Sequence, residues 1–153
     1  MTQILQKNLE RGKQVAWLLS LAGLIPFTGL ALLIFIFKSG HPLFETLITA
    51  FKFWSIIVLA FLGGIRWGFA LTSQPYDIRS LTFSVIGSCL AFFAIFLPNI
   101  LFIMVLILLY CLHGAWDNIF IHNSRLPQWF GNIRVALTFL VVLAHGIVLL
   151  AFL

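Results

Sequence analysis

Charged residues are scarce in this sequence. Of its 153 residues, Asp, Glu, Lys and Arg together make up 8%, whereas hydrophobic residues make up 62%. Soluble domains carry about 25% charged residues, so the polar surface that a water-soluble globule needs is missing. This excludes an ordinary soluble enzyme, a disordered tail, a coiled coil and a nucleic-acid-binding module. The net charge of +5 comes from nine Lys and Arg residues against four Asp and Glu residues, and in a membrane chain such an excess usually sets orientation.

Cysteines are rare, and recognisable catalytic motifs are missing. The two cysteines, Cys89 and Cys111, lie inside apolar runs, where we expect small buried side chains. A disulfide framework needs more cysteines in a polar secreted chain, and no Cys and His residues have the spacing of zinc ligands. The sequence also contains no Gly-rich phosphate loop, no Ser-His-Asp set and no HExxH motif. These absences favour a non-enzymatic protein without a metal or another cofactor.

Long apolar runs, in contrast, fill most of the chain. A membrane-spanning helix takes about 20 apolar residues, and helices satisfy their own backbone hydrogen bonds in lipid. We therefore predict an all-α integral membrane bundle of five transmembrane helices, in a single membrane domain over residues 1–153. The first run is too long for the apolar part of a signal peptide, so it is predicted to be an uncleaved anchor, kinked near Pro26. The five spans cover residues of about 15–37, 43–71, 80–97, 100–117 and 133–153.

Lys and Arg residues fall unevenly on the two sides of these spans. With the N-terminus in the cytoplasm, seven of them lie on the inner side and two on the outer side, as the positive-inside rule requires. The same threading places the C-terminus outside. Four of the five tryptophans lie near inner ends, where an indole ring suits the headgroup region. The inner basic residues are Lys7, Arg11, Lys13, Arg66, Arg79, Arg125 and Arg134, the outer ones are Lys38 and Lys52, and the four tryptophans are Trp17, Trp67, Trp116 and Trp129.

Small residues form a stripe in the second span. Ala60, Gly64 and Gly68 recur every four residues, beside Gly63. Small residues at this spacing let another helix backbone approach closely. We expect the stripe to pack against another helix of the same chain, with the face of a dimer as the alternative.

Charged side chains near membrane depth are the best candidates for a site, because each is costly in lipid unless it is paired or hydrated. Arg66 ends the second span, Asp117 lies near the inner end of the fourth, and Arg134 opens the fifth. We predict that Asp117 pairs with Arg66 or Arg134, with His113 one turn away on the same helix face. One interpretation is a polar clasp that holds three helix ends together. A second is an anion or headgroup site formed by the two arginines and Trp67, and a third is snorkelling without specific partners.

The other polar residues within the spans are weaker candidates for a functional site. Glu45 and Lys52 are two turns apart on roughly one face of the second span, so we expect them to meet near the outer surface. His113 and His145 suggest two axial haem ligands. The rise of a helix, however, places His145 several ångströms further out than His113, so packing roles are favoured over haem.

The segment from Arg125 to Asn132 mixes turn formers with aromatic residues. We expect a loop that lies against the inner headgroups, with Trp129 and Phe130 inserted among them. A surface that binds a partner is the alternative.

Three stretches of the sequence resemble those of a known family. They read LAGLIPF at residues 21–27, FLGGIRWG at residues 61–68 and LPQWFGNIRVALT at residues 126–138. In this order they resemble the transmembrane protein 69-like family, a domain-of-unknown-function family of bacterial and mitochondrial membrane proteins. Similar proteins often carry Ser where Ala60 stands and His where Arg66 stands, which argues against a titrating role for position 66. The resemblance implies a small multi-pass protein of the bacterial inner (cytoplasmic) membrane, or of the mitochondrial inner membrane in a eukaryote, and it supplies no substrate.

Two functions are compatible with these observations. The leading hypothesis is a non-enzymatic accessory or assembly factor that docks to other membrane proteins through its small-residue helix faces. The alternative is a binder or carrier of a lipid or small molecule, with a cavity between the helices near Arg66, Trp67 and Asp117. The expected partners are the lipid bilayer and other membrane proteins, with a homo-oligomer left open and nucleic acid excluded.

Overall fold

The protein is seen in a computed structural model that describes residues 2–72, 75–122 and 128–153. Throughout these ranges the regular structure is helical, without a strand, which confirms the predicted all-α fold. The helices are α1 (Thr2–Ala22), α2 (Ile25–Phe37), α3 (Phe44–Thr72), α4 (Ile78–Ala94), α5 (Asn99–His122) and α6 (Gln128–Leu150).

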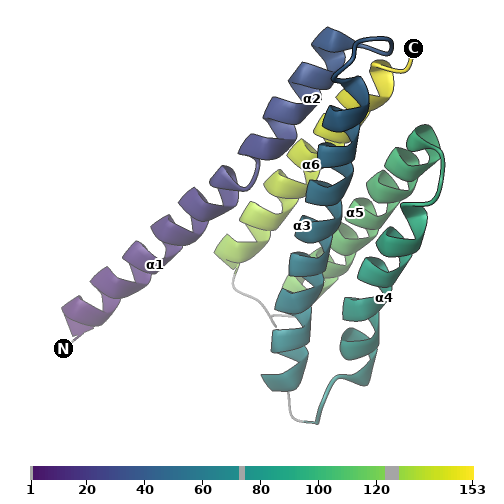
Figure 1. Ribbon diagram of the computed structural model, residues 1–153. Coiled ribbons are helices and arrows are strands. Elements are labelled where there is room, and N and C mark those ends of the chain that lie inside the picture. The colour runs from purple at the N-terminus through teal and green to yellow at the C-terminus, as the bar shows by residue number, and fades with distance from the viewer. Residues whose placement is uncertain (1, 73–74, 123–127) are drawn as a thin grey trace.

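The helices form a membrane bundle. Four segments are long and apolar enough to cross a membrane, namely Gln3–Phe37, Phe44–Thr72, Asn99–Ile119 and Gln128–Leu150. The fifth apolar helix, α4, has 17 residues, which is at the lower limit of about 17–25 residues for a span. The described helices run back and forth along the bundle, and the two termini lie at opposite ends of it (Figure 1). Large apolar side chains such as Phe61, Phe93 and Phe139 are exposed on its outer faces, as lipid contact requires.

The first apolar run is two helices rather than one kinked helix. The break lies at Gly23 and Leu24, just before the predicted kink, and Pro26 is in the first turn of α2. Proline is favourable there because it lacks the N–H that the first turn leaves unpaired. The polar start of the chain is helical as well, since α1 begins at Thr2. No residue of α1 from Gln3 onward is buried, and Figure 1 shows α1 leaving the bundle at an angle.

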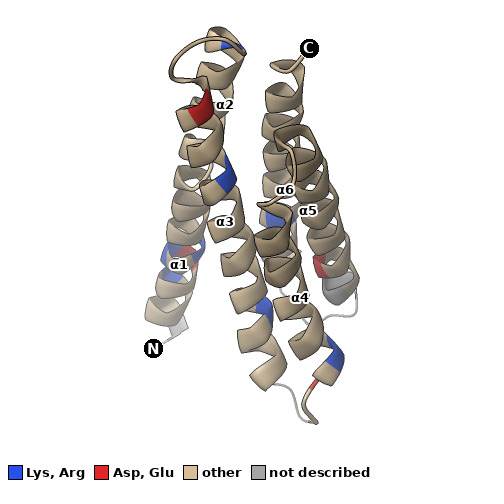
Figure 2. Ribbon diagram, turned by 45° about the vertical axis from the view of Figure 1, so that its right-hand side comes forward, with Lys and Arg blue, Asp and Glu red and all other residues tan. Residues whose placement is uncertain are grey.

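Helix α3 is central to the packing. It contacts α2, α4 and α5, while α6 packs against α2 and α5, and α1 contacts α6. The middle of the core is aromatic: Phe27 of α2 packs edge-on against Phe51 of α3, with ring centroids 5.8 Å apart, and against Tyr110 of α5 at 6.2 Å. The Tyr110 hydroxyl donates a hydrogen bond of 2.8 Å to the Ser55 carbonyl of α3. Lys and Arg residues gather mainly towards the end of the bundle where the N-terminus lies (Figure 2).

The small residues that bring helices together differ from those predicted. Ala60, Gly64 and Gly68 are exposed, and a Cβ added at either glycine would meet no atom within 4 Å. The prediction that this stripe packs against a helix of the same chain is therefore wrong. The close approach of α3 to α4 occurs at Gly63, where an added Cβ would overlap the Ser84 carbonyl oxygen. Two other glycines also leave room for a neighbouring helix. A Cβ added at Gly87 of α4 would overlap the His113 ring of α5, and one added at Gly114 of α5 would overlap the Thr138 side chain of α6.

Several helix ends also differ from the apolar runs. Helix α5 continues to His122 and α6 begins at Gln128, so Trp129 and Phe130 belong to the first turn of α6 rather than to a loop. The first residues of that predicted loop, including Arg125, lie outside the described residues. Helix α4 ends at Ala94, three residues before the predicted span does. Cys89 and Cys111 are unpaired and exposed on the outer faces of α4 and α5, contrary to the expectation that they are buried.

Candidate functional site

A cluster of three charged side chains joins α3, α5 and α6. An Arg66 terminal nitrogen, Nη2, donates a hydrogen bond of 2.7 Å to Asp117 Oδ1. From the other side, Arg134 Nε donates a bond of 2.7 Å to Asp117 Oδ2, and Arg134 Nη2 lies 2.6 Å from the same oxygen. The sequence suggested one of these pairs, but the single carboxylate contacts both arginines. The three residues lie near the end of α3, near the end of α5 and near the start of α6, which places them at one end of the bundle.

The cluster is buried and its charges do not balance. The relative exposure of the side chains is 7% for Arg66, 14% for Asp117 and 6% for Arg134. Among the described residues, Asp117 is the one carboxylate within ion-pair distance of either arginine. The two guanidinium groups and the carboxylate together carry one net positive charge. Burying charge is costly unless it is paired and fully hydrogen-bonded, so this surplus is the outstanding electrostatic feature of the site.

Two neighbours complete the surroundings of Arg66. The carbonyl oxygen of His113, one turn before Asp117, accepts a second hydrogen bond of 3.3 Å from Arg66 Nη2. The His113 ring itself lies against Gly87 of α4, the residue whose missing side chain makes room for it. The Trp116 ring lies near the guanidinium, with its centroid 5.8 Å from Arg66 Cζ, a distance at which a cation and an aromatic face attract.

Trp67, the tryptophan predicted at this site, is 44% exposed on α3, so its inclusion was wrong. Neighbouring positions on a helix point in different directions. Trp67 therefore does not share the inward direction of Arg66. No spacing along the chain pointed to Trp116 as a neighbour of Arg66, because its approach depends on how α5 is rotated against α3.

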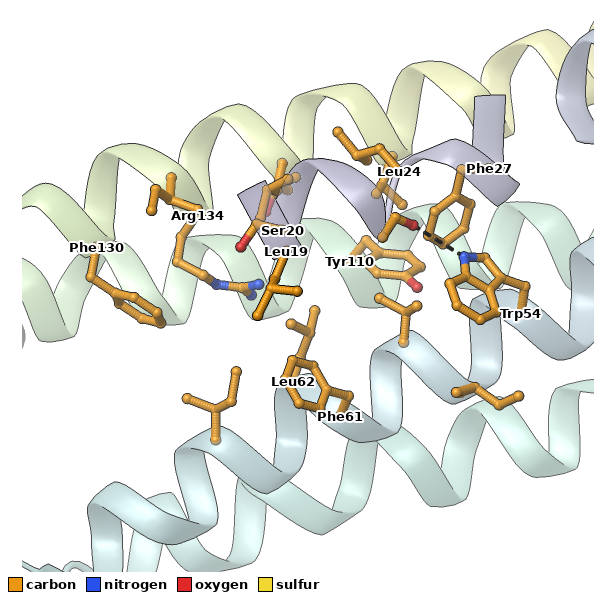
Figure 3. Close-up of a pocket in the computed structure, with 18 residues that line it drawn as sticks. Leu19, Ser20, Leu24, Phe27, Trp54, Phe61, Leu62, Tyr110, Phe130 and Arg134 are labelled. Carbon is orange, nitrogen blue, oxygen red and sulfur yellow. Dashed lines mark hydrogen bonds between the residues drawn. The ribbon is translucent and has the colours of Figure 1, made fainter. Parts of the chain in front are cut away.

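An apolar cavity of about 340 Å³ lies beside the cluster. Its walls come from the end of α1, the start of α2 and the facing sides of α3, α5 and α6, and Figure 3 shows the side chains that line it. Arg134 and Phe130 lie at one end of the cavity, with Phe27 and Trp54 at the other (Figure 3). The Trp54 indole nitrogen donates a hydrogen bond of 3.3 Å to the Gly23 carbonyl, at the break between α1 and α2. Arg134 is therefore shared between the charged cluster and the cavity.

A much smaller void adjoins the cluster directly. It measures about 20 Å³ and is lined by Arg66, Asp117, Arg134 and Phe130, among others. Leu62, Ile65, Phe130 and Arg134 line both spaces. A void of roughly 10–15 Å³ or more can hold a water molecule when polar groups surround it. The cluster thus has room for a single small polar group beside its carboxylate.

The alternative function predicted from the sequence placed a cavity near Arg66, Trp67 and Asp117, but none of these residues lines the apolar cavity. Tyr110, Trp54 and Phe130 face the cavity from three different helices, so no spacing along the chain connects them. The nearest signal was the kink predicted near Pro26, three residues after Gly23, whereas the break itself lies at Gly23 and Leu24. A break in a spanning helix leaves room at the point where the two halves diverge, and the cavity lies there.

The other candidate polar residues lie away from this site. His145 is fully buried, with its Nδ1 2.8 Å from the Val141 carbonyl oxygen and its ring 4.8 Å from that of Phe51. It therefore packs in the aromatic core, whereas His113 packs against α4. Within the described parts of the chain, no group of three His, Cys, Asp or Glu residues is placed to hold a metal.

Lys52 does not meet Glu45 as the sequence suggested. Its Nζ donates hydrogen bonds of 3.3 Å to Asn99 Oδ1, at the start of α5, and of 3.4 Å to the Ile95 carbonyl oxygen, at the end of α4. It also lies 4.6 Å from the centre of the Phe102 ring. Glu45, in the first turn of α3, is exposed. The lysine therefore fastens α3 to the connection between α4 and α5.

Comparisons with known proteins give one family and no solved structure. Residues 12–150 match a family model described as a protein of unknown function (DUF3429). The chain is 33% identical to transmembrane protein 69 of Mus musculus over 135 residues, which is 86% of this chain and 54% of that protein. It is also 33% identical to transmembrane protein 69 of Xenopus tropicalis over 144 residues, 89% of this chain and 54% of that protein. The chain spans about half the length of the curated relatives it matches. No solved structure matches it.

Proposed function

The chain belongs to the DUF3429 family of multi-pass membrane proteins, and we propose that it binds a lipid or another amphipathic small molecule in the cavity beside Arg134. One observation carries this proposal, namely that an apolar cavity of about 340 Å³ ends at a buried arginine. Small-molecule sites are commonly concave, mostly apolar and roughly 300–1,000 Å³ in volume, with a few polar groups that orient the ligand. This cavity has those properties.

The cavity is accessible from the lipid. Leu19 of α1 and Ile57 and Phe61 of α3 line it and are also 68%, 57% and 66% exposed on the outer surface. The opening therefore lies between α1 and α3, on the side where α1 leaves the bundle (Figure 1). A molecule dissolved in the bilayer can enter there sideways without crossing water. This geometry suits a binder or carrier of lipid-soluble molecules.

Filling the cavity tests the proposal. Leu137 of α6 lines the cavity, whereas Leu143 of the same helix is 50% exposed and does not. We expect native mass spectrometry of the protein released from mild detergent to show a retained lipid-sized molecule on the wild type and on Leu143→Trp. Leu137→Trp should lose it, because the indole occupies the ligand's space. Equal retention by all three proteins, or no retained molecule on any of them, would contradict the proposal.

A second candidate function is docking to another membrane protein, as an accessory or assembly factor or as a homo-oligomer. It is favoured by the exposed stripe of Ala60, Gly64 and Gly68, which no helix of the described chain covers. Stripes of this kind let two membrane helices pack closely. Chemical cross-linking in native membranes should give a discrete product that Gly64→Leu abolishes. The matched control is Gly29→Leu, at an exposed glycine of α2 that also has open space around it. If Gly64→Leu leaves the product unchanged, docking through this stripe is ruled out.

We also propose the bacterial inner membrane as the location, or the mitochondrial inner membrane in a eukaryote, with the N-terminus in the cytoplasm or matrix. The gathering of Lys and Arg towards the N-terminal end of the bundle supports this orientation (Figure 2). Reporter proteins fused to either terminus should be active on opposite sides of the membrane. Reporters active on the same side would contradict the threading.

A further inference from the structure

The surplus charge of the cluster indicates what kind of ligand the cavity takes. Arg66 and Arg134 face one carboxylate, that of Asp117, so the buried group carries one positive charge that no described residue neutralises. Near membrane depth such a charge is costly, and it is normally found paired or hydrated. The void of about 20 Å³ beside the carboxylate has space for no more than a water-sized group. The larger space is where a compensating anionic group has room.

Arg134 is the arginine that faces this larger space. Its side chain lines the cavity and points into it from α6, beside Leu62 and Leu19 (Figure 3). Asp117 Oδ2 accepts a hydrogen bond of 2.7 Å from its Nε and lies 2.6 Å from its Nη2, so this one oxygen contacts one edge of the planar guanidinium group. Guanidinium N–H groups bind carboxylate and phosphate oxygens strongly because both partners are charged. The end of the cavity thus presents a guanidinium group that shares a single carboxylate with Arg66 and carries unbalanced positive charge.

The rest of the cavity wall is apolar and runs away from this charge. Leu137 and Val141 follow Arg134 on the same face of α6 and line the cavity in turn. The seven residue steps from Arg134 to Val141 extend over about 10 Å at the rise of an α-helix. Phe27 and Trp54 close the far end (Figure 3). The space therefore has one cationic end and one long apolar body.

From these features we propose that the ligand is an anionic amphiphile, with a carboxylate or phosphate group bound to Arg134 and an apolar chain that lies along α6 towards Trp54. This inference rests on the proposed function, since it names the class of molecule that the cavity binds. Asp117 acts here as a positioning residue, because its hydrogen bond to Nε holds the guanidinium at the mouth of the apolar body. The same chemistry is found in a fatty acid and in an anionic phospholipid that inserts one chain.

Quenching of Trp54 fluorescence tests the inference. The protein is placed in nanodiscs of phosphatidylcholine, and a fatty acid brominated at mid-chain is added. Bromine quenches tryptophan on contact, and Trp54→Phe shows which part of the quenching comes from the cavity. The neutral control is the alcohol with the same brominated chain. In a second arm, brominated phosphatidylglycerol and brominated phosphatidylcholine in the disc separate the fatty acid from the phospholipid as the source of the anionic group.

We expect saturable Trp54 quenching by the brominated fatty acid, by brominated phosphatidylglycerol or by both. The apparent affinity for the matching neutral probe, the alcohol or phosphatidylcholine, should be at least about tenfold weaker. The reason is that hydrogen bonds to charged groups contribute roughly 1.5–3 kcal/mol. Arg134→Met should weaken binding of the anionic probe by a similar factor and leave the neutral probe unchanged. Arg134→Lys, which keeps the charge, should restore part of the affinity.

A second variant, Arg66→Met, controls for the possibility that Arg134→Met loses binding because it misfolds. Arg66 does not line the larger cavity, and Arg66→Met leaves a neutral pair between Asp117 and Arg134. We expect it also to weaken binding of the anionic probe, because the surplus charge disappears while the cavity wall stays the same.

The two proposals fail in different ways. If acid and alcohol, and likewise the two phospholipids, quench Trp54 equally well, the anionic inference is wrong and the cavity remains a binding site. If no probe gives quenching that depends on Trp54, the proposed function fails and the inference fails with it.

Discussion

The two faces of α3 carry similar small residues and have opposite surroundings. We call the inner face the buried side formed by Ser55, Leu59, Gly63 and Arg66, and the outer face the exposed side formed by Ala60, Gly64 and Gly68. Gly63 and Gly64 are adjacent in the sequence. An added Cβ at Gly63 would overlap the backbone of α4, whereas one at Gly64 would meet nothing within 4 Å. A shift of one residue thus separates an interhelical contact from an open surface.

This difference shows where the polar residues of a membrane helix belong. On the inner face, the Ser55 carbonyl accepts a hydrogen bond from Tyr110 and the Arg66 guanidinium is held by Asp117. Groups left without partners in lipid would be costly. The outer face between Ala60 and Gly68 presents small and apolar side chains only. The inner face therefore carries the specific interactions of the fold, and the outer face is available to lipid or to another helix.

Removing the carboxylate should damage the inner face most. Asp117→Asn leaves the guanidinium groups of Arg66 and Arg134 buried without a counter-charge. We expect a loss of about 3–5 kcal/mol in the free energy of unfolding, as is usual when one partner of a buried ion pair is removed. Unfolding in mixed micelles titrated with SDS measures it. Glu45→Gln, at an exposed position in the first turn of α3, is the control and should change the free energy little. Similar losses in both variants would contradict a structural role for the cluster.

Adding a single methyl group should affect stability differently on the two faces of α3. Gly63→Ala places a Cβ against the Ser84 carbonyl, which is backbone and cannot move aside freely. We expect it to lower the free energy of unfolding by roughly 1–3 kcal/mol, the usual cost of overpacking. Gly64→Ala adds the same methyl group in open space and is expected to be neutral in the same titration. If the two variants lose stability equally, α3 is rotated differently from the structure described here.

Much of the fold followed from the sequence because it depends on apolar length. The runs that end near Phe37 and Thr72 are longer than a bilayer requires, so their helices were evident. The cluster could be predicted for a related reason. Arg66, Asp117 and Arg134 are rare charges in apolar surroundings, where a charge is stable only when it is paired or hydrated. The binding of one carboxylate by two arginines was not evident, because it depends on the rotation of three helices.

Other features were missed because they depend on contacts between helices. The spacing of Ala60, Gly64 and Gly68 is the same whether or not a helix covers them, so the sequence could not assign them to the outer face. The cavity exists because the chain breaks at Gly23 and α1 turns away, while the sequence pointed to a kink near Pro26. Trp67 adjoins Arg66 in the chain, but adjacency on a helix does not produce contact, and it is Trp116 of α5 whose ring lies near the Arg66 guanidinium.

The smallest expected effect concerns a single neutral hydrogen bond on the inner face. Tyr110→Phe removes the hydroxyl that donates to the Ser55 carbonyl at 2.8 Å, while the ring keeps its packing against Phe27. We expect a loss of roughly 0.5–1.5 kcal/mol, since hydrogen bonds between membrane helices contribute modestly. Tyr76→Phe, at a residue that is 58% exposed, provides the matched control in the same SDS titration and should be neutral. An unchanged stability for Tyr110→Phe would mean that packing and the charged cluster alone hold the inner face. The interactions that distinguish the inner face from the outer face would then be those of Gly63 and Arg66.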